Sequence, residues 1–91
     1  MKLKGTKFQL KIWCFLMKIP KGSVMTYSQV AKAVGRPLAV RAVANAIAKN
    51  PYPIQIPCHR IIRSDGSLGG YSAVGGVKRK KNLLKKEGII I

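Results

Sequence analysis

The amino-acid sequence predicts a mainly α, winged-helix-like domain with a helix-turn-helix and short strands. Two short helix-forming segments, residues 28–34 and 39–49, flank a break at Gly35-Arg36-Pro37, which is typical of a helix-turn-helix. Apolar residues recur at helical spacing near both ends of the chain. A length of 91 residues suits one domain, 1–91, with a single core.

The first helix is predicted over residues 7–18, with Thr6 as its N-cap. Cys14 falls inside this helix, and we expect it to be a core residue. Pro20-Lys21-Gly22 should end the helix. One side of the helix is apolar: Phe8, Ile12, Phe15, Leu16 and Ile19.

The helix-turn-helix follows a crossing segment at residues 24–27. Its first helix, residues 28–34, has Thr26 or Ser28 as a candidate cap. Its second helix, residues 39–49, is dense in alanine and is the candidate DNA-facing element. Alanine is also simply the best helix former, so the composition of this helix has a purely structural explanation too.

The second half of the chain begins with a rigid connection broken by Pro51, Pro53 and Pro57. Residues 58–62 should form a short strand or a turn of helix, and residues 63–67 a tight turn. A last helix is predicted over residues 77–87, followed by Gly88 at C′ and an apolar tail, residues 89–91. We expect Val77, Leu83 and Leu84 to face inward, and the basic residues to face mostly outward: Lys78, Arg79, Lys80, Lys81, Lys85 and Lys86.

The charge balance is extreme, because the net charge is +16 and only Asp65 and Glu87 are acidic. Such a field attracts polyanions, which indicates nucleic acid as a partner. A lysine-rich thermophilic surface would normally bring glutamate as well.

One histidine and two acids make a four-ligand zinc site implausible, and two cysteines show no disulfide framework. With no apolar run of about 20 residues, we expect no membrane partner and an intracellular location, in the cytoplasm (nucleoid) or nucleus.

The sequence Ile56-Pro57-Cys58-His59-Arg60 places a thiol and the only histidine of the chain behind a rigid connection. A cysteine acts as a nucleophile only as its thiolate, which needs a base or a positive field nearby. Histidine is the side chain best suited to move protons near neutral pH. A structural role for Cys58 is the alternative, since free cysteine is often buried.

Several blocks of this sequence resemble the O6-alkylguanine-DNA alkyltransferases. They are residues 22–27, Arg41-Ala42-Val43, Asn50-Pro51, Pro57-Cys58-His59-Arg60, residues 69–72 and residues 83–88. The resemblance implies the C-terminal catalytic domain of that family, without the N-terminal domain that most members carry. It implies a monomeric suicide repair protein that needs no cofactor and no metal, acts on double-stranded DNA containing alkylated guanine, and transfers the alkyl group to its own Cys58.

The resemblance also implies catalytic roles. His59 would draw the proton from Cys58 through a water, Glu87 would orient His59, Asn50 would brace the backbone around Cys58, and Tyr27 would protonate the departing guanine. The alternative for Glu87 is a surface ion pair with Lys80 or Lys81.

The substrate-binding residues implied are Tyr27, Ile47, Ile61, Gly69, Gly70, Tyr71 and Ser72. The glycine-rich part of this set could instead be a flexible surface loop.

The DNA-binding residues implied by the resemblance lie mainly on the alanine-rich helix. That helix would enter the minor groove, and Arg41 would fill the gap left by the extruded nucleotide. The complete set is Arg41, Ala39, Val40, Ala42, Ala44, Ser28 and Ser64. The sequence departs from the family where Ala73-Val74 come between the Tyr-Ser pair and two glycines, which affects the shape of the pocket loop.

Three other functions compete with this interpretation. An alkyltransferase-like protein would bind lesions and flag them without catalysis, but such proteins typically replace the cysteine that is present here as Cys58. A basic nucleoid or ribosomal protein would explain the charge but not the Pro-Cys-His-Arg block. A cysteine hydrolase would need an oxyanion hole, for which the sequence gives no indication.

Overall fold

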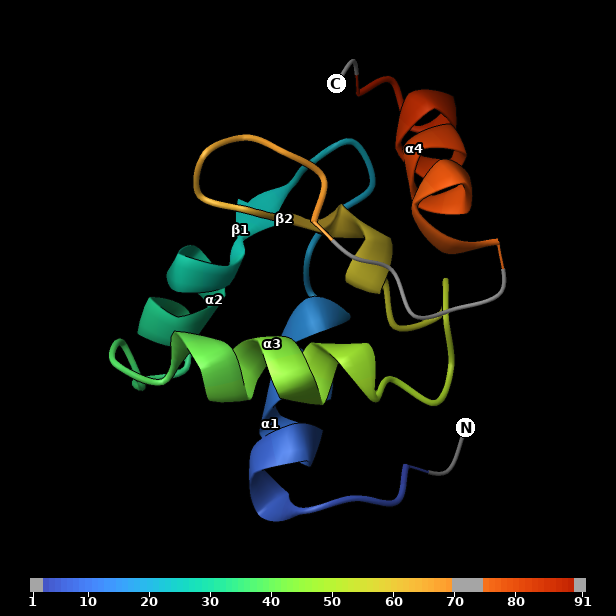
Figure 1. Ribbon diagram of the computed structural model, residues 1–91. Coiled ribbons are helices and arrows are strands. Elements are labelled where there is room, and N and C mark those ends of the chain that lie inside the picture. Colours follow the sequence, from blue (N-terminus) through green and yellow to red (C-terminus); the bar gives the residue numbers. More distant parts are fainter. Residues whose placement is uncertain (1–2, 70–74, 90–91) are drawn as a thin grey trace.

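The computed structural model describes residues 3–69 and 75–89. Within these residues the chain forms four α-helices, one 3-10 helix and two short strands (Figure 1). In chain order they are α1 (Lys7–Leu16), β1 (Met25–Thr26), α2 (Tyr27–Ala33), α3 (Val40–Ala48), η1 (Cys58–Arg60), β2 (Ile61–Ile62) and α4 (Gly76–Lys86). The predicted class, mainly α with a helix-turn-helix and short strands, is confirmed. No described helix has the length and apolar character needed to cross a membrane.

Helix α1 begins as predicted, because Thr6 and Gln9 form a capping box that satisfies backbone donors of the first turn. Its buried side consists of Ile12, Trp13 and Leu16. Trp13 ties α1 to the helix-turn-helix, because its indole Nε1 donates a hydrogen bond of 2.8 Å to the carbonyl of Ala46. The helix ends at Leu16, two residues earlier than predicted.

The prediction that Cys14 is a core residue is wrong, because its side chain is exposed. Each residue of an α-helix turns the side chain by about 100°. The bulky Trp13 is 2% exposed and occupies the packed side, so its neighbour Cys14 points to solvent.

Helices α2 and α3 form the predicted helix-turn-helix. Thr26, rather than Ser28, caps α2, and its partner in the capping box is Gln29. Gly35 ends α2 with a φ of 77°, a conformation that residues with a side chain rarely adopt. The core face of the two helices contains the predicted Val30, Ala31 and Val34, joined by Val43, Ala46 and Ile47.

The two strands are brought together although the sequence separates them widely. β1 and β2 pair in parallel, with Met25 opposite Ile61 and Thr26 opposite Ile62. Residues 58–62 form both of the structures considered for them, first the 3-10 turn η1 and then β2. The strand pair therefore places the start of α2 beside the segment that contains Cys58.

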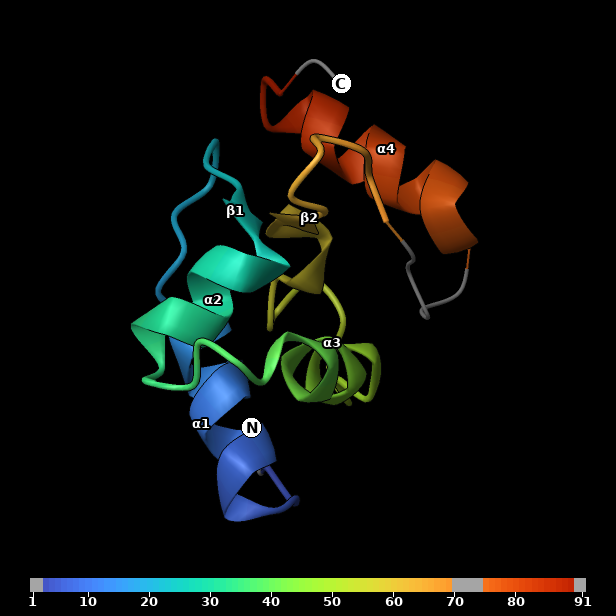
Figure 2. The ribbon, with the colours of Figure 1, turned by 60° about the vertical axis from the view of Figure 1, so that its left-hand side comes forward.

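Helix α4 packs against η1 and lies on the other side of it from α1 in two views (Figures 1 and 2). Leu84 faces inward as predicted, with 1% exposed. The orientation of two other residues was predicted wrongly: Val77 is 44% exposed, whereas Lys80 is fully buried. Gly88 follows the helix as expected, and Ile89 donates a backbone hydrogen bond to Leu84. Residues 90 and 91 of the predicted tail lie outside the described residues.

Candidate active site

Cys58 is the first residue of η1 and is 6% exposed. Its backbone N–H donates to the carbonyl of Ile56 at 2.7 Å. Burial raises the pKa of the Cys58 thiol, because a thiolate is poorly stabilised away from water. A hydrogen bond from Asn50 and the positive charge of Lys80 act in the opposite direction. The thiol therefore lies in a buried setting that contains two features favouring its ionised form.

Asn50 follows α3 and holds the connection that leads to Cys58. Its Nδ2 donates to the carbonyl of Ile56 at 2.7 Å, and its Oδ1 accepts from the N–H of Tyr52 at 2.9 Å. The bond to Ile56 closes the loop that contains Pro51 and Pro53, and the bond from Tyr52 orders the start of that loop. The Asn50 side chain, together with backbone hydrogen bonds from Ile56 to Tyr52 and from Cys58 to Ile56, thus holds the backbone that leads to Cys58.

His59 is 1% exposed and is held by Glu87 from the end of α4. Its Nε2 lies 2.8 Å from Oε2 of Glu87. A carboxylate accepts hydrogen bonds, so Nε2 carries the proton and Nδ1 of a neutral ring has a lone pair. This Nδ1 is buried and forms no hydrogen bond with any residue in the described part of the chain. The lone pair is therefore available for a proton.

Arg60 completes this network, although its place in the sequence predicted no role for it. Its Nε and NH2 groups donate to the two oxygens of Glu87 at 2.8 Å, and NH1 donates to the carbonyl of Ile19. The paired guanidinium is the main reason why the pKa of Glu87 falls from its ordinary 4.5 to about 2. The alternative surface pair with Lys80 or Lys81 is not what forms, since the ion pairs of Glu87 go to His59 and Arg60.

Tyr27 lines an open hollow of about 430 Å³ on the helix-turn-helix side. Val40, Arg41, Ala44 and Arg63 complete its lining. Burial is the main cause of the raised pKa of the Tyr27 phenol; negative charge on Cys58 adds to it and Arg63 opposes it. The phenol therefore stays protonated at neutral pH and can donate a proton.

Gly69 lies directly against Tyr27. Its φ is 71°, and a Cβ at this position would come within 3.4 Å of the phenol oxygen and 3.3 Å of Arg63 Cγ. A larger residue would therefore be strained and would crowd the hollow. The other predicted pocket-loop residues, Gly70, Tyr71 and Ser72, lie outside the described residues, as do Ala73 and Val74.

Lys80 is the residue that the sequence analysis placed least accurately. It is 0% exposed, and its Nζ donates a hydrogen bond to the carbonyl of Ile61. Its ammonium lies 6.0 Å from the centre of the Tyr27 ring. Burial lowers its pKa to about 8. The neighbouring lysines and arginine gave no signal that one position of this basic helix would face the core.

Four further predicted site residues are Ser28, Ser64, Ile47 and Ile61. Ser28 and Ser64 meet, with their hydroxyl oxygens 3.0 Å apart. Ile47 and Ile61 are core residues, 4% and 0% exposed, and Ile47 is not part of the lining of the Tyr27 hollow. Ser64 lies in the predicted tight turn, in which Asp65 accepts two hydrogen bonds from Ser67.

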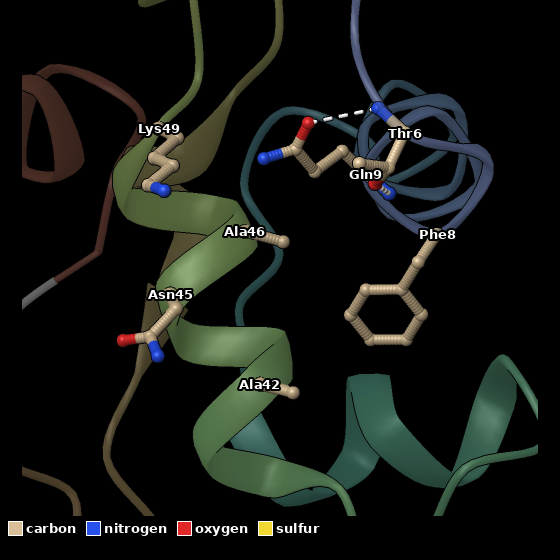
Figure 3. A pocket seen from close by; sticks show the side chains of 7 residues that line it. All are labelled: Thr6, Phe8, Gln9, Ala42, Asn45, Ala46 and Lys49. Carbon is tan, nitrogen blue, oxygen red and sulfur yellow. Dashed lines mark hydrogen bonds between the residues drawn. The ribbon is translucent and has the colours of Figure 1, made fainter.

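Helix α3 separates the Tyr27 hollow from a second one. Val40, Arg41 and Ala44 face the first, and Ala39 is the partly buried N-cap of the helix. Ala42 and Ala46 instead point toward Phe8 of α1 (Figure 3). The hollow there has a volume of about 200 Å³ and is lined by Thr6, Phe8, Gln9, Ala42, Asn45, Ala46 and Lys49. Of the predicted DNA-binding residues, Ala42 is thus on a different side of α3 from Arg41.

A search of the described residues finds no group of three or more His, Cys, Asp or Glu side chains placed to hold a metal ion.

Residues 7–89 match the model of the family described as 6-O-methylguanine DNA methyltransferase, DNA binding domain. The match covers the helix-turn-helix, η1 and α4. This chain belongs to that family. Its relatives include the bifunctional transcriptional activator/DNA repair enzyme Ada of Escherichia coli, 51% identical over 85 residues, which are 93% of this chain and 23% of Ada. A methylated-DNA–protein-cysteine methyltransferase of Methanothermobacter thermautotrophicus is 51% identical, with 92% of this chain and 46% of the relative covered.

Solved structures agree with this family assignment. Mycobacterium tuberculosis OGT in complex with DNA matches with a TM-score of 0.90 and 44% identity, over 94% of this chain and 52% of that one. Schizosaccharomyces pombe Atl1 in complex with damaged DNA containing O6-carboxymethylguanine matches with a TM-score of 0.84 and 31% identity, over 98% and 82%. The chain spans between about a quarter and half of the length of the curated relatives named here.

Proposed function

We propose that this chain is a single-turnover DNA repair protein that transfers an alkyl group, chiefly methyl, from O6 of guanine to Cys58. The observation that carries the proposal is the arrangement of Cys58 with His59 and Glu87. Cys58 precedes His59 in the sequence, and the buried imidazole of His59 has its Nε2 held by a carboxylate and an available lone pair on Nδ1. The family model describes a DNA-binding domain; we propose that the same domain, the C-terminal catalytic domain of the family, also carries the reaction.

The reaction begins with loss of the Cys58 proton. His59 Nδ1 takes this proton, by way of a water, and the Glu87 carboxylate stabilises the imidazolium that results. The thiolate then attacks the alkyl carbon, a carbon–sulfur bond forms, and the bond between that carbon and O6 breaks. The electrons of the broken bond remain with guanine. The product is a thioether, which water does not cleave under cellular conditions, so each chain reacts once.

The departing guanine gains a proton from the Tyr27 phenol in this mechanism. Its position in the hollow with Arg41 and Ala44 supports this role, since the phenol lines the same hollow as residues of the predicted DNA-facing helix. The substrate atom is inaccessible inside a duplex, so the nucleotide must rotate out, at a cost of a few kcal/mol. Arg41 is exposed on α3 and would fill the space that the nucleotide leaves.

Binding to double-stranded DNA is supported by charge and by fold. The net charge of +16 favours a polyanionic partner, and α2 and α3 form a helix-turn-helix. We further propose that the domain acts as a monomer inside the cell, in the cytoplasm or nucleus, where thiols stay reduced.

An alkyltransferase-like protein, which binds lesions without repairing them, is the second candidate function. It is favoured by the likeness to Schizosaccharomyces pombe Atl1, which extends over 82% of that chain. The presence of Cys58, buried beside His59, favours alkyl transfer instead. The two candidates differ in one observable, the movement of label from DNA to protein.

The test is transfer of radiolabelled methyl from duplex DNA containing O6-methylguanine. With excess DNA, the chain should take up one methyl group and then stop, and mass spectrometry should place that group on the peptide containing Cys58. Cys58→Ser should abolish transfer and keep DNA binding. Cys14→Ser is the matched control and should react like the parent, because Cys14 is exposed on α1. Binding without transfer would establish the lesion-binding function, and turnover beyond one equivalent would refute the suicide mechanism.

A further inference from the structure

Helix α4 is the most densely charged helix of the described residues, although α3 is the helix that is predicted to face DNA. Six of the 11 residues of α4 are lysine or arginine, whereas Arg41 is the one charged residue of α3. Four lysines of α4 are exposed and form its basic face: Lys78, Lys81, Lys85 and Lys86. Within residues 3–69 and 75–89, none of these four forms a salt bridge. Alkyl transfer by Cys58 gives this face no role.

The basic face points away from the candidate active site. Lys80 and Leu84 are the buried residues of α4, and α4 packs against η1. Each residue of an α-helix turns the side chain by about 100°, so Lys78 and Lys85 lie roughly opposite Lys80. In both views η1 lies between α4 and α3 (Figures 1 and 2). The basic face is therefore turned away from α3 as well.

The arrangement of these lysines disfavours the helix that carries them. Lys81 and Lys85 are four residues apart, and like charges at this spacing repel each other on a helix surface. Lys78 lies in the first turn, which contains no acidic residue, and positive charge there opposes the helix dipole. Neutral helix formers such as glutamine would avoid both effects. A bound polyanion would remove them, because it neutralises the lysines.

The chemistry of the basic face fits the phosphate backbone of duplex DNA. Lys78 and Lys85 are seven residues apart, which is about 10 Å along a helix and about the axial distance over which one DNA strand carries three phosphates. Lysine is a cation without acceptor atoms, which suits phosphate oxygens. α4 has no aromatic side chain on which unpaired bases could stack. A helix that lies on a membrane needs a broad exposed apolar side, and in α4 the apolar Leu84 packs inward.

We propose that the basic face of α4 is a second DNA-binding surface, which holds the phosphate backbone of one duplex segment while the helix-turn-helix holds another. Duplex DNA has a persistence length of about 150 base pairs, so a short segment in contact with α3 does not bend round to a face turned away from it. Two bound segments would let the domain pass from one to the other without dissociating. This inference rests on the DNA binding of the proposed function, but it requires no alkyl transfer.

The experiment measures whether one protein molecule joins two duplexes. Lesion-free duplexes of about 15 base pairs, which behave as stiff rods, are attached to beads or labelled with a fluorophore, and the full chain is added. The captured fluorescence reports joining. The triple variant Lys78→Gln, Lys81→Gln and Lys85→Gln should capture about tenfold less of the second duplex, because its phosphate contacts are lost. Glutamine is a good helix former, so α4 should remain folded.

The matched control removes the same charge from exposed lysines on α1 and just after it, on the other side of η1. This triple variant, Lys7→Gln, Lys11→Gln and Lys18→Gln, should capture the second duplex as the parent does. Both variants should still bind a single duplex containing O6-methylguanine, as measured by fluorescence anisotropy. Equal capture by the two variants would overturn the proposal. Loss of single-duplex binding in the α4 variant alone would also overturn it, since α4 would then belong to the first DNA site. So would binding of the basic face to anionic lipid vesicles in place of the second duplex.

A second measurement tests passage between segments. The protein is bound to a fluorescent duplex, unlabelled duplex is added in excess, and the rate of release is followed by stopped flow. The rate should rise with the concentration of unlabelled duplex in the parent and in the α1 control, because the second segment binds before the first one leaves. It should be independent of that concentration in the α4 variant, and independence in the parent would refute passage. Both measurements use binding alone, so failure of methyl transfer is distinguishable from failure of this surface.

Discussion

Helices α3 and α4 both support the segment around Cys58, yet the side chains on their surfaces are very different. α3 leads into Asn50, carries four alanines at positions 42, 44, 46 and 48, and has Arg41 as its one charged residue. In α4, six of 11 residues are lysine or arginine: Lys78, Arg79, Lys80, Lys81, Lys85 and Lys86. α3 buries three residues of its apolar side, whereas α4 buries Leu84 and Lys80.

The difference separates two contributions to one site. α3 determines the shape of the hollow, because its small side chains leave room beside Tyr27 and the longer side chain of Arg41 projects beyond them. α4 provides charge, because Glu87 at its end holds His59 and Lys80 in its middle bonds to Ile61. Variants of the inward-facing residues of α4 should therefore alter thiol chemistry with any alkylating agent, and variants of α3 should alter only reactions that require DNA.

The largest effect is expected for Glu87→Gln. The variant removes the charge that orients His59 and stabilises its protonated form, so alkyl transfer at neutral pH should slow about a hundredfold. Free O6-benzylguanine and methylated duplex DNA should be affected equally, because the loss concerns Cys58 and not DNA. Single-turnover rates with both substrates provide the measurement, and a loss restricted to duplex DNA would contradict the role of α4.

The same variant has a consequence for stability. In the folded chain the pKa of Glu87 is about 2, below its ordinary 4.5, so the carboxylate stabilises the fold above about pH 4.5. That stabilisation is lost as the pH falls from 4.5 toward 2. Acid unfolding followed by circular dichroism should show this loss in the parent and in the control Asp65→Asn, and a smaller loss in Glu87→Gln.

A smaller effect, confined to DNA, is expected for Arg41→Ala. The side chain is exposed on α3 and would support the extruded nucleotide, so its loss should reduce repair of duplex DNA about tenfold, equivalent to about 1.4 kcal/mol. Reaction with free O6-benzylguanine needs no extrusion and should keep its rate. Paired rate measurements test this, and an equal decrease with both substrates would remove Arg41 from the extrusion step.

The smallest effect concerns the charge pattern of α4 itself. Lys78 lies in the first turn, where positive charge opposes the helix dipole, and Lys85 lies in the last turn, where it is favourable. Both are exposed. Lys78→Glu should therefore raise the free energy of unfolding by about 0.5 kcal/mol, and Lys85→Glu should lower it by about the same amount. Urea denaturation would show the opposite signs, and equal shifts in one direction would rule out a dipole effect.

Local structure was predicted well where a short stretch of sequence decides it. The capping boxes at Thr6 and Thr26 involve residues three apart, and Gly35 ends α2 through its own backbone. Helix ends agreed with prediction within about two residues. The errors at Cys14 and Val77 have one cause: periodicity indicates which side of a helix is apolar, but the neighbouring elements decide which residues that side buries.

The site was predicted only in part from the sequence. The Cys58-His59 motif and the resemblance indicated a candidate nucleophile and a candidate base, and the side chain of Asn50 bonds to the carbonyl of Ile56, two residues before Cys58. Arg60 was part of the same motif, but it bonds to Glu87, which is 27 residues away in the sequence, and no feature of the neighbouring residues indicates this pairing. Lys80 was missed because a lysine among lysines gives no sign of burial.

The sequence by itself determined the positions of the helices, the turn between α2 and α3, the excess of positive charge and the presence of a Cys-His pair. These depend on neighbouring residues or on composition. Only the tertiary structure decided that Glu87 holds His59 and that Lys80 is buried with its ammonium bonded to the carbonyl of Ile61. Both contacts require α4 to pack against η1, and they depend on the direction of side chains more than 15 residues apart in sequence. A buried ion pair or ammonium is stabilised by partners from distant segments, so its place is decided only when the chain has folded.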